Sequence, residues 1–317
     1  MSTDSTPVFR FAPSPNGWLH LGHALSAIMN AEAAQRRGGR FLLRIEDIDI
    51  MRARDEYVAG ISEDLHWLGL SWEEPVRRQS QFMADYARAL ERLRERGVLY
   101  PCICSRTDIA RAVEEKERKL RAPWPRDPDG APLYPGTCRR LAVDDKDEAA
   151  IASESCAWRL DMDRALQLIG DPIVWTECPD DDASARIVAE PRAWGDIVVA
   201  RKDIGTSYHL AVVVDDALQG VTHVIRGRDL YHATSVQRVL QELLGLPEPL
   251  YTHHRLVLDE AGAKLSKSAK STSLRELRAQ GQTPADVRAL LGVSRGLFDR
   301  DAKRPEPEHG CDDGQRR

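Results

Sequence analysis

The sequence lacks the long apolar runs and the apolar N-terminal segment of membrane and secreted proteins. Its longest apolar stretches, such as 210–214 (LAVVV), fall far short of the roughly 20 residues that a membrane-spanning helix needs. The first ten residues, MSTDSTPVFR, contain no apolar core of the kind that a signal peptide requires. We therefore expect a cytoplasmic protein that has no membrane partner.

Cysteine is also scarce, and positive charge is not in excess. Six cysteines in 317 residues do not suggest a disulfide scaffold. The formal net charge of −5 excludes a general electrostatic attraction to nucleic acid, so an RNA partner would be held by local basic patches. What remains is an ordinary globular composition, 42% hydrophobic and 30% charged, in a chain long enough for about two domains.

The first fifty residues predict a strand, a tight turn, a helix and a second strand. The first strand covers 8–12, the helix runs from about 23 to 37 and ends at two glycines, and the second strand covers 41–45. Such a βαβ unit is the building block of a doubly wound parallel sheet, so we predict an α/β fold with a Rossmann-type sheet. Later apolar patterns predict helices at 57–68, 82–93 and 236–244 and strands at 197–200, 210–214 and 221–226.

Changes in composition divide the chain further. The segment 101–191 holds five of the six cysteines, a charged helical run and a proline-rich stretch. We predict that it is an inserted module between two halves of the sheet domain, 1–100 and 192–270. Capping signals at Ser273 and Thr283 predict a short helical segment at 271–298. The charged, aromatic-free stretch 299–317 is predicted to be a disordered tail.

Two histidines, His20 and His23, lie three residues apart where the first predicted strand gives way to its helix. The free N–H groups and the positive dipole end of a helix N-terminus favour phosphate at such a place. Gly22 allows an adenine or a ribose to approach the backbone closely. Imidazole N–H donors here can bind phosphate oxygens and stabilise the negative charge of a transition state. Taken alone, the four-residue motif more often marks surface histidines in a turn.

A second motif, Lys264-Leu-Ser-Lys-Ser268, lies about 240 residues further along the chain. Its lysines are three residues apart with a hydroxyl between them, a pattern that can clamp a polyphosphate. In a loop, Lys264 and Lys267 can close on a phosphate during a reaction. The alternative for this motif alone is a solvated basic loop.

Both motifs, in this order and at this separation, resemble the paired signatures of class I aminoacyl-tRNA synthetases. The segments RFAPSPNGWLHLGHA, GGRFLLRIEDID, YHLAVVVDD, GVTHVIRGRDL and KLSKS narrow the resemblance to the glutamyl-tRNA synthetase family, over about 9–273. The resemblance implies a nucleotide-binding ligase that uses ATP with Mg²⁺ to convert L-glutamate into glutamyl-adenylate. The glutamate would then pass to a tRNA.

The chain departs from full-length members of this family after the lysine motif. Only about fifty residues follow it, too few for the large helical anticodon-binding domain of those enzymes. Val212 and Leu230 stand where full-length members commonly carry Asn and Trp. These departures are similar to the short paralogue of the family, which attaches glutamate to the queuosine base at the wobble position of tRNA(Asp). We therefore expect queuosine-containing tRNA(Asp) as the RNA partner, and we expect a monomer.

The resemblance also implies a role for each candidate site residue. The catalytic residues that it implies are His20, His23, Lys264 and Lys267. The ATP-binding residues are His20, Gly22, His23 and Lys267. The glutamate-binding residues are Arg10, Phe11, Ala12, Pro13, Ser14, Glu46, Tyr208 and Arg226. The chemistry agrees, because two guanidiniums and one carboxylate complement the two carboxylates and the ammonium of glutamate. Without the resemblance, Arg10 and Glu46 are equally well interpreted as an internal ion pair.

Three cysteines of the predicted module, Cys102, Cys104 and Cys138, suggest a structural zinc site, which needs four tetrahedral ligands. The short paralogue supplies a tyrosine at the position that matches Tyr134. Its phenol needs the charge of the metal to ionise, since free phenol has a pKa near 10. Other candidates for the fourth ligand are water, Cys156 and Cys178, and free cysteines are the alternative to a metal site.

A basic run in the same module could face RNA phosphates, although such a run on a helix is more often only solvated. It comprises Arg106, Arg111, Lys116, Arg118, Lys119 and Arg121. Two other functions stay open at this point. One is a truncated glutamyl-tRNA synthetase that charges a tRNA 3′ end, and the other is a non-catalytic RNA-binding paralogue.

Overall fold

The computed structural model describes residues 6–140, 156–170, 172–178, 184–258 and 272–293, and their strands form two sheets. In spatial order the main sheet holds β3 (Glu73–Arg78), β2 (Arg40–Ile45), β1 (Val8–Phe11), β9 (His223–Gly227), β10 (Leu250–His254), β6 (Val174–Glu177) and β7 (Ala185–Val188). The small sheet holds β4 (Leu99–Cys102), β5 (Ala157–Leu160) and β8 (Val198–Ala200). All pairs in the main sheet are parallel except β6 with β7, so the predicted α/β fold with a parallel sheet is confirmed.

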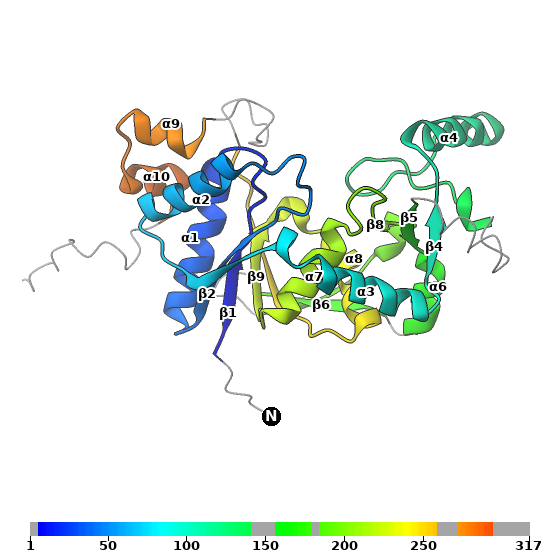
Figure 1. Ribbon diagram of the computed structural model, residues 1–317, viewed down its shortest axis with the longest axis horizontal. Coiled ribbons are helices and arrows are strands. Elements are labelled where there is room, and N and C mark those ends of the chain that lie inside the picture. The colour runs from blue at the N-terminus through cyan, green and yellow to red at the C-terminus, as the bar shows by residue number, and fades with distance from the viewer. Residues whose placement is uncertain (1–5, 141–155, 171, 179–183, 259–271, 294–317) are drawn as a thin grey trace, which may run out of the picture.

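Helices cover both faces of the main sheet. The helices of the described residues are α1 (Leu21–Arg36), α2 (Asp55–Trp67), α3 (Met83–Glu95), α4 (Arg106–Leu120), α6 (Met162–Ile169), α7 (Tyr208–Leu218), α8 (Ala233–Leu244), α9 (Leu274–Ala279) and α10 (Pro284–Leu291). Single 3₁₀ turns are η1 (Gln79–Gln81), η2 (Cys138–Arg140), η3 (Pro191–Trp194) and η4 (Arg228–Leu230). Figure 1 shows α1 and α2 at one end of the molecule and α4 with the small sheet at the other. Among the described helices, none has the length and apolarity that crossing a bilayer requires.

The two faces follow from the alternation of side chains along β1. Phe9 and Phe11 belong to the core that includes α1 and α2, whereas Val8 belongs to a separate core on the opposite face. Arg10 also points to that opposite face, where it contacts α7. Helix α1 packs on β1, β2 and β9, and α8 packs on β6. The sheet is therefore covered on both sides, as in doubly wound folds.

One predicted strand is wrong. The segment 210–214 lies in helix α7, which begins after the N-cap residue Ser207. A short run of apolar and β-branched residues has no periodicity that separates a strand from a buried helix. Here the helix is buried over residues 210–216, because α7 packs against α3, α8 and β8, and even Asp215 and Asp216 are buried.

The segment 101–191 contributes to both sheets. Strand β5 and the last two residues of β4 lie in the small sheet, whereas β6 and β7 extend the main sheet. Helix α4 lies beyond the small sheet, and a loop connects it to the cysteine-bearing turn η2 (Figure 1). Where the inserted module begins and ends, and how the other domains divide, stays a prediction.

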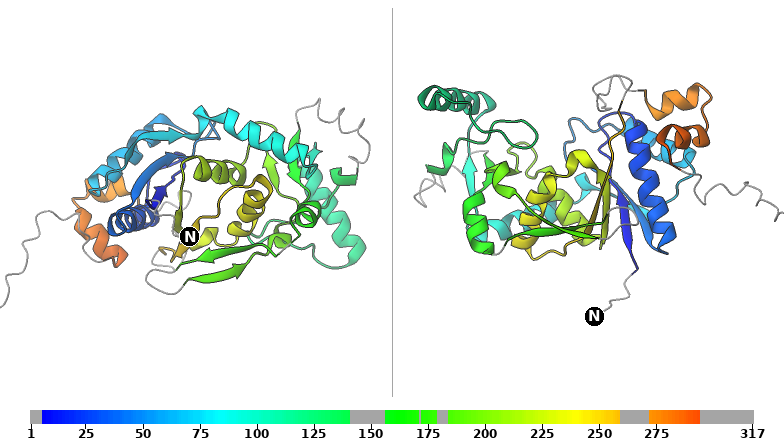
Figure 2. Two further views of the ribbon diagram at one scale, coloured as in Figure 1. Left: turned by 90° about the horizontal axis from the view of Figure 1, so that it is seen from below. Right: turned by 180° about the vertical axis from the view of Figure 1, so that it is seen from behind.

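Two short helices follow the lysine motif, and each begins after the N-cap residue that the sequence predicts. Ser273 caps α9 with Glu276, and Thr283 caps α10 with Asp286. Both helices lie beside α1 and α2 in all views (Figures 1 and 2). The lysine motif itself and the predicted tail 299–317 lie outside the described residues.

The buried position of α7 makes a stability prediction. Leu210 is 0% exposed and packs in the core that α7 shares with α3 and α8, so Leu210→Ala should lower the free energy of unfolding by about 2–5 kcal/mol. The matched control is Leu218→Ala at the exposed end of the same helix, which should change it by less than about 0.5 kcal/mol. Urea unfolding of both variants provides the comparison, and equal effects would contradict the packing described here.

Candidate active site

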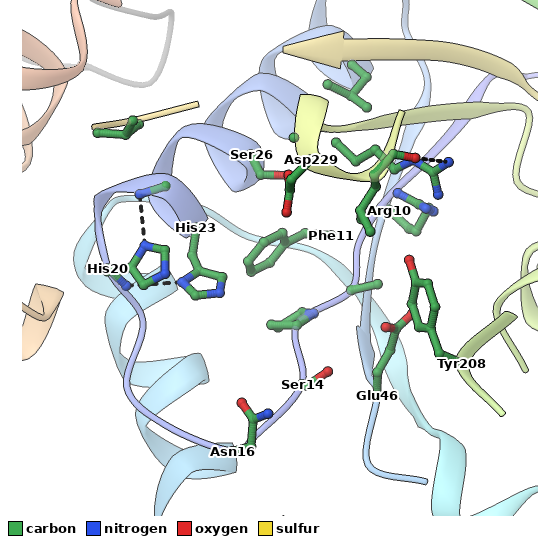
Figure 3. Close-up of a pocket in the computed structure, with 18 of the residues that line it drawn as sticks. Arg10, Phe11, Ser14, Asn16, His20, His23, Ser26, Glu46, Tyr208 and Asp229 are labelled. Carbon is green, nitrogen blue, oxygen red and sulfur yellow. Dashed lines mark hydrogen bonds between the residues drawn. The ribbon is translucent and has the colours of Figure 1, made fainter. Parts of the chain in front are cut away.

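A cavity of about 980 Å³ opens where β1, β2 and β9 end. Strand β1 lies between β2 and β9 and is followed by α1, so the cavity lies at the point where the strand order reverses, which is the usual ligand site of such sheets. It is lined by every described residue that the sequence predicts for ATP or glutamate: Arg10, Phe11, Ala12, Pro13, Ser14, His20, Gly22, His23, Glu46, Tyr208 and Arg226. In Figure 3, Phe11 separates the two histidines from Arg10, Glu46 and Tyr208.

The histidines form the N-terminus of α1. His20 is the N-cap, and its Nδ1 accepts from the backbone N–H of Gly22 at 3.1 Å. His23 Nδ1 accepts from the backbone N–H of His20 at 3.2 Å, and the two ring centroids are 3.9 Å apart. A Cβ on Gly22 would lie only 3.0 Å from the His20 ring, so this glycine also makes room for the imidazole.

These two contacts determine which ring nitrogen is protonated. Because each Nδ1 accepts a hydrogen bond, a neutral ring carries its proton on Nε2. His20 and His23 can therefore each present an Nε2–H donor while their other nitrogen fixes the ring on the backbone. Such preorganised donors at a helix N-terminus suit a phosphate whose negative charge grows during reaction.

The turn that carries His20 is held from behind by α9. Ser273 forms a backbone bridge with His20, and the Leu274 N–H donates to the Leu19 carbonyl at 2.8 Å. Further along α9, Arg278 lies 3.6 Å from Asp64 of α2. Burial raises the pKa of Asp64 to about 6, which Arg278 counteracts only in part.

On the other side of Phe11, charged side chains form a buried network. Asp216 of α7 accepts from Arg10 Nε at 3.1 Å and from Arg44 Nη1 at 2.7 Å. Arg44 Nη2 lies 3.1 Å from Glu46. Among the described residues no ion pair joins Arg10 to Glu46. Each of them is instead paired with another internal residue, Arg10 with Asp216 and Glu46 with Arg44.

Burial and charge act in opposite directions on the pKa values of the two acids. Burial raises the pKa of Glu46, although Arg44 and Arg10 counteract it. For Asp216 the same burial is outweighed by Arg10 and Arg44, and the pKa of Asp216 is lowered. Glu46 is therefore the acid that gains most from a further positive charge in the cavity.

The residues that hold this network were not predicted as site residues. They are Arg44, Asp215 and Asp216. Asp215 accepts from Arg77 Nε at 2.7 Å, and also from Gln79 and Tyr86, which fixes α7 to the β3 side of the sheet. The signal was present in the sequence, because charged residues inside or next to apolar runs must find buried partners.

Tyr208 and Arg226 complete the glutamate side of the cavity. Tyr208 is the first residue of α7, so the network around Asp216 also sets its position. Arg226 donates to Gln237 and Thr234, both at 2.7 Å, and to the Leu230 carbonyl at 3.2 Å. Leu230 lines the cavity, whereas Val212 is 2% exposed and lies in the core.

The cysteines Cys102, Cys104 and Cys138 have their sulfurs within 4.8 Å of one another and could hold a metal ion. The Tyr134 hydroxyl lies 3.4 Å from Cys102 Sγ and 3.5 Å from Cys104 Sγ. Tetrahedral zinc with ordinary bond lengths separates an oxygen and a sulfur ligand by about 3.5 Å, so these four groups fit that metal. The Arg159 guanidinium donates to Cys102 Sγ and lies 3.8 Å from the Tyr134 ring centroid, where it offsets negative charge.

Two acids that closely follow Glu46 in the sequence, and two lysines of the basic run, have structural contacts. Asp47 accepts from Ser80 and Arg78, and Asp49 lies 3.3 Å from Arg201. In the basic run of α4, Lys116 donates to the Pro135 carbonyl, and Lys119 pairs with Glu115. These two lysines therefore contribute to the fold of their own segment.

Comparison with known proteins agrees with this geometry. The family model described as tRNA synthetases class I (E and Q), catalytic domain, matches residues 8–300. A glutamyl-Q tRNA(Asp) synthetase from Rhodobacter capsulatus is 46% identical over 90% of this chain and all of that protein. One from Symbiobacterium thermophilum is 40% identical over 94% of this chain and 88% of its own length.

A similar fold occurs among solved structures. A glutamate-tRNA synthetase from Elizabethkingia anophelis superposes with a TM-score of 0.72 at 23% identity. The match covers 90% of this chain and 61% of that one, so the chain spans about three-fifths of the length of the solved relative.

The Asp64 contact that supports the His20 turn makes a pH prediction. An acid whose pKa is higher in the folded state costs stability as the pH rises from its ordinary value of about 4 to its folded value of about 6. The free energy of unfolding of Asp64→Asn, relative to that of the parent protein, should therefore rise by about 1–2 kcal/mol as the pH rises across this interval. Chemical unfolding at pH 4, 5, 6 and 7 measures the difference. Glu91→Gln, which removes an exposed carboxylate, is the control, and a pH-independent difference for Asp64→Asn would rule out this explanation.

Proposed function

The chain belongs to the catalytic-domain family of class I tRNA synthetases for glutamate and glutamine, and we propose that it activates glutamate with ATP and transfers it to the queuosine base at the wobble position of tRNA(Asp). One observation carries the proposal. A single cavity at the switch point of the sheet has a histidine pair on one side and two arginines with a glutamate on the other. That combination complements a nucleotide triphosphate next to a dicarboxylic amino acid.

Glutamate would bind on the side of the cavity that the Asp216 network supports. Arg10 would pair with one substrate carboxylate, Arg226 would contact the other, and Glu46 would hold the α-ammonium. An ammonium beside Glu46 would add to the positive charge of Arg44, which does not by itself outweigh the effect of burial on the pKa of Glu46. Tyr208 would contact the amino acid, and Phe11, Ala12, Pro13 and Ser14 would form the wall towards the nucleotide.

ATP would bind at the start of α1, with Gly22 against the nucleoside and His20 and His23 at the α-phosphate. The glutamate α-carboxylate attacks the α-phosphorus, a new oxygen–phosphorus bond forms, and pyrophosphate leaves. The histidine donors stabilise the charge on the pentavalent phosphorus, so positioning and electrostatics supply most of the catalysis. Mg²⁺ bound with ATP supplies charge neutralisation at the β- and γ-phosphates.

Lys264 and Lys267 would assist at the phosphates. They lie outside the described residues, so their roles rest on the resemblance and on the chain to either side of them. Val257, shortly before them, lines the cavity, and Ser273, shortly after them, bridges His20. The described residues on either side of the lysine motif therefore reach the cavity at Val257 and the His20 turn at Ser273.

In the second step a hydroxyl of the queuosine cyclopentene-diol attacks the glutamyl-adenylate, an ester bond forms and AMP leaves. The choice of this acceptor rests on the names of the relatives, glutamyl-Q tRNA(Asp) synthetase. With tRNA and ATP as substrates, we place the enzyme in the cytoplasm, and we propose that it acts as a monomer.

We also propose that Cys102, Cys104, Tyr134 and Cys138 hold one structural zinc ion. Zinc at this place supplies a crosslink between the end of β4 and the turn η2. Burial raises the pKa of Tyr134, so the phenol acts as an anionic ligand only beside a cation. The positive charge of Arg159 supports the same state.

Two assays test the proposed reaction. Exchange of pyrophosphate into ATP should depend on glutamate and proceed without tRNA, and it should fall by at least about 100-fold in His20→Ala. Native tRNA(Asp) should then accept glutamate, whereas a transcript that lacks queuosine should not.

The outcomes separate the alternatives. Equal charging of the unmodified transcript would indicate a truncated glutamyl-tRNA synthetase that charges the 3′ end. Absence of glutamate-dependent exchange in the parent protein would indicate a non-catalytic RNA-binding paralogue.

The zinc proposal has its own test. Metal analysis of the purified protein should find one equivalent of zinc, and Cys138→Ala should lose it. Tyr134→Phe should bind zinc more weakly, by about 10-fold or more, in a competition with a chromogenic chelator. A Cys178→Ala variant is the control, since Cys178 lies at the end of β6 and outside the sulfur cluster. Full zinc content in Cys138→Ala would contradict the assignment.

A further inference from the structure

Behind Arg226, a row of buried side chains crosses the carboxyl ends of three neighbouring strands. Arg226 lies on β9, His253 is its direct partner in register on β10, and Glu177 is the last residue of β6. The His253 side chain is only 2% exposed. Neither His253 nor Glu177 has a role in the reaction described above.

The contacts of His253 define its tautomer. Its Nε2 lies 3.1 Å from Arg226 Nε, and because a guanidinium can only donate, Nε2 must accept. A neutral ring then carries its proton on Nδ1, which lies 2.8 Å and 3.0 Å from the two oxygens of Glu177. The backbone N–H of His253 also donates to Glu177 at 2.8 Å, so the ring is held on both sides.

Arg226 differs in this respect from Arg10, which also lines the cavity, and from the buried Arg44. Arg10 and Arg44 pair directly with Asp216. Arg226 has neutral acceptors, and in the described part of the chain no carboxylate lies within ion-pair distance of it. Glu177 reaches it only through the imidazole. The charge of Arg226 is thereby stabilised without being neutralised, and it stays available to an anionic ligand.

We propose that His253 is a positioning residue for substrate glutamate. As a neutral imidazole anchored by Glu177, it fixes the Nε edge of Arg226, so that the one Nη1 N–H left over by the other contacts of the guanidinium faces a carboxylate of the amino acid. This inference rests on the proposed function, since it takes Arg226 as a glutamate ligand. The same arrangement predicts that glutamate binding weakens when His253 becomes protonated, because a second N–H would then oppose Arg226 Nε.

The surroundings of His253 keep it neutral near pH 7. The charged and titratable groups that face it are Glu177, Arg226, Tyr231, Tyr251 and His254. Burial lowers the pKa of His253, and this outweighs the opposite effect of Glu177. Burial also raises the pKa values of both tyrosines, which are therefore uncharged. Protonation of His253 is thus confined to pH values below the ordinary histidine pKa of about 6.5.

Substitutions that keep one of the two contacts can separate them. The amide oxygen of glutamine reaches approximately the place of Nε2, so His253→Gln can still accept from Arg226. Asparagine reaches only the Nδ1 place, and methionine supplies neither contact. In pyrophosphate exchange we expect His253→Met and His253→Asn to raise the KM for glutamate about 10-fold or more, with the KM for ATP changed less than twofold. His253→Gln should stay within about threefold of the parent protein.

The pH profile provides a readout that a merely structural role would not change. In the parent protein the KM for glutamate should rise as the pH is lowered through the pKa of His253. In His253→Gln this acid-dependent rise should be absent. The matched control is His223→Met. It replaces the histidine at the amino end of β9, whereas Arg226 lies near the carboxyl end, and it should leave the KM for glutamate unchanged.

Three results would overturn the proposal: an unchanged KM for glutamate in His253→Met, an equal rise in the KM for ATP, or a His253→Gln variant as impaired as His253→Met. The tautomer can also be determined without an activity assay, from the ¹⁵N NMR chemical shifts of the His253 ring at neutral pH. An Nε2–H or doubly protonated ring would refute the positioning role even in an active enzyme. A parent protein without glutamate-dependent exchange, but with the Nδ1–H ring, would instead refute the proposed function.

Discussion

The carboxylate of Asp216 holds the amino-acid side of the cavity together. It accepts from Arg10 on β1 and from Arg44 on β2, and Arg44 in turn contacts Glu46. A buried ion without partners costs several kcal/mol, so each of these charges is tolerated only because the others are present. Because Asp216 lies on α7, the same contacts fix that helix against the sheet and set the place of Tyr208 at its first turn.

The nucleotide side of the cavity is built differently. His20, Gly22 and His23 are held by backbone hydrogen bonds within four residues of the chain, at the start of α1. The bridge between His20 and Ser273 and the hydrogen bond from the Leu274 N–H to the Leu19 carbonyl connect this turn to α9. A phosphate site of this kind is therefore encoded almost entirely in local sequence, whereas the amino-acid site depends on contacts between residues up to 206 positions apart.

This difference explains what could be predicted. The first strand, helix and second strand followed from local apolar patterns and glycines, and the structure brings the candidate residues they carry to one cavity. Helix α7 was misread because its apolar run is equally compatible with a buried strand. Strand β3, with the sequence EEPVRR, was not predicted, because an edge strand needs no apolar alternation. The partners of Arg10 and Arg226 could not be predicted either, because no periodic pattern in the sequence connects Arg10 with Asp216 or Arg226 with His253.

The two arginines of the amino-acid site have different electrostatic roles. Arg10 shares its charge with Asp216, so replacing a bound carboxylate by a neutral group would still leave it paired. Arg226 has only neutral acceptors among the described residues, so a neutral group in place of a carboxylate would leave a buried cation without a counter-ion. A site that binds the charged form of its substrate through such a residue rejects the uncharged amide more strongly than contact geometry alone would. When the carboxylate that Arg226 binds is the one on the substrate side chain, discrimination between glutamate and glutamine depends on keeping protein carboxylates away from Arg226, and the imidazole of His253 lies between Arg226 and Glu177.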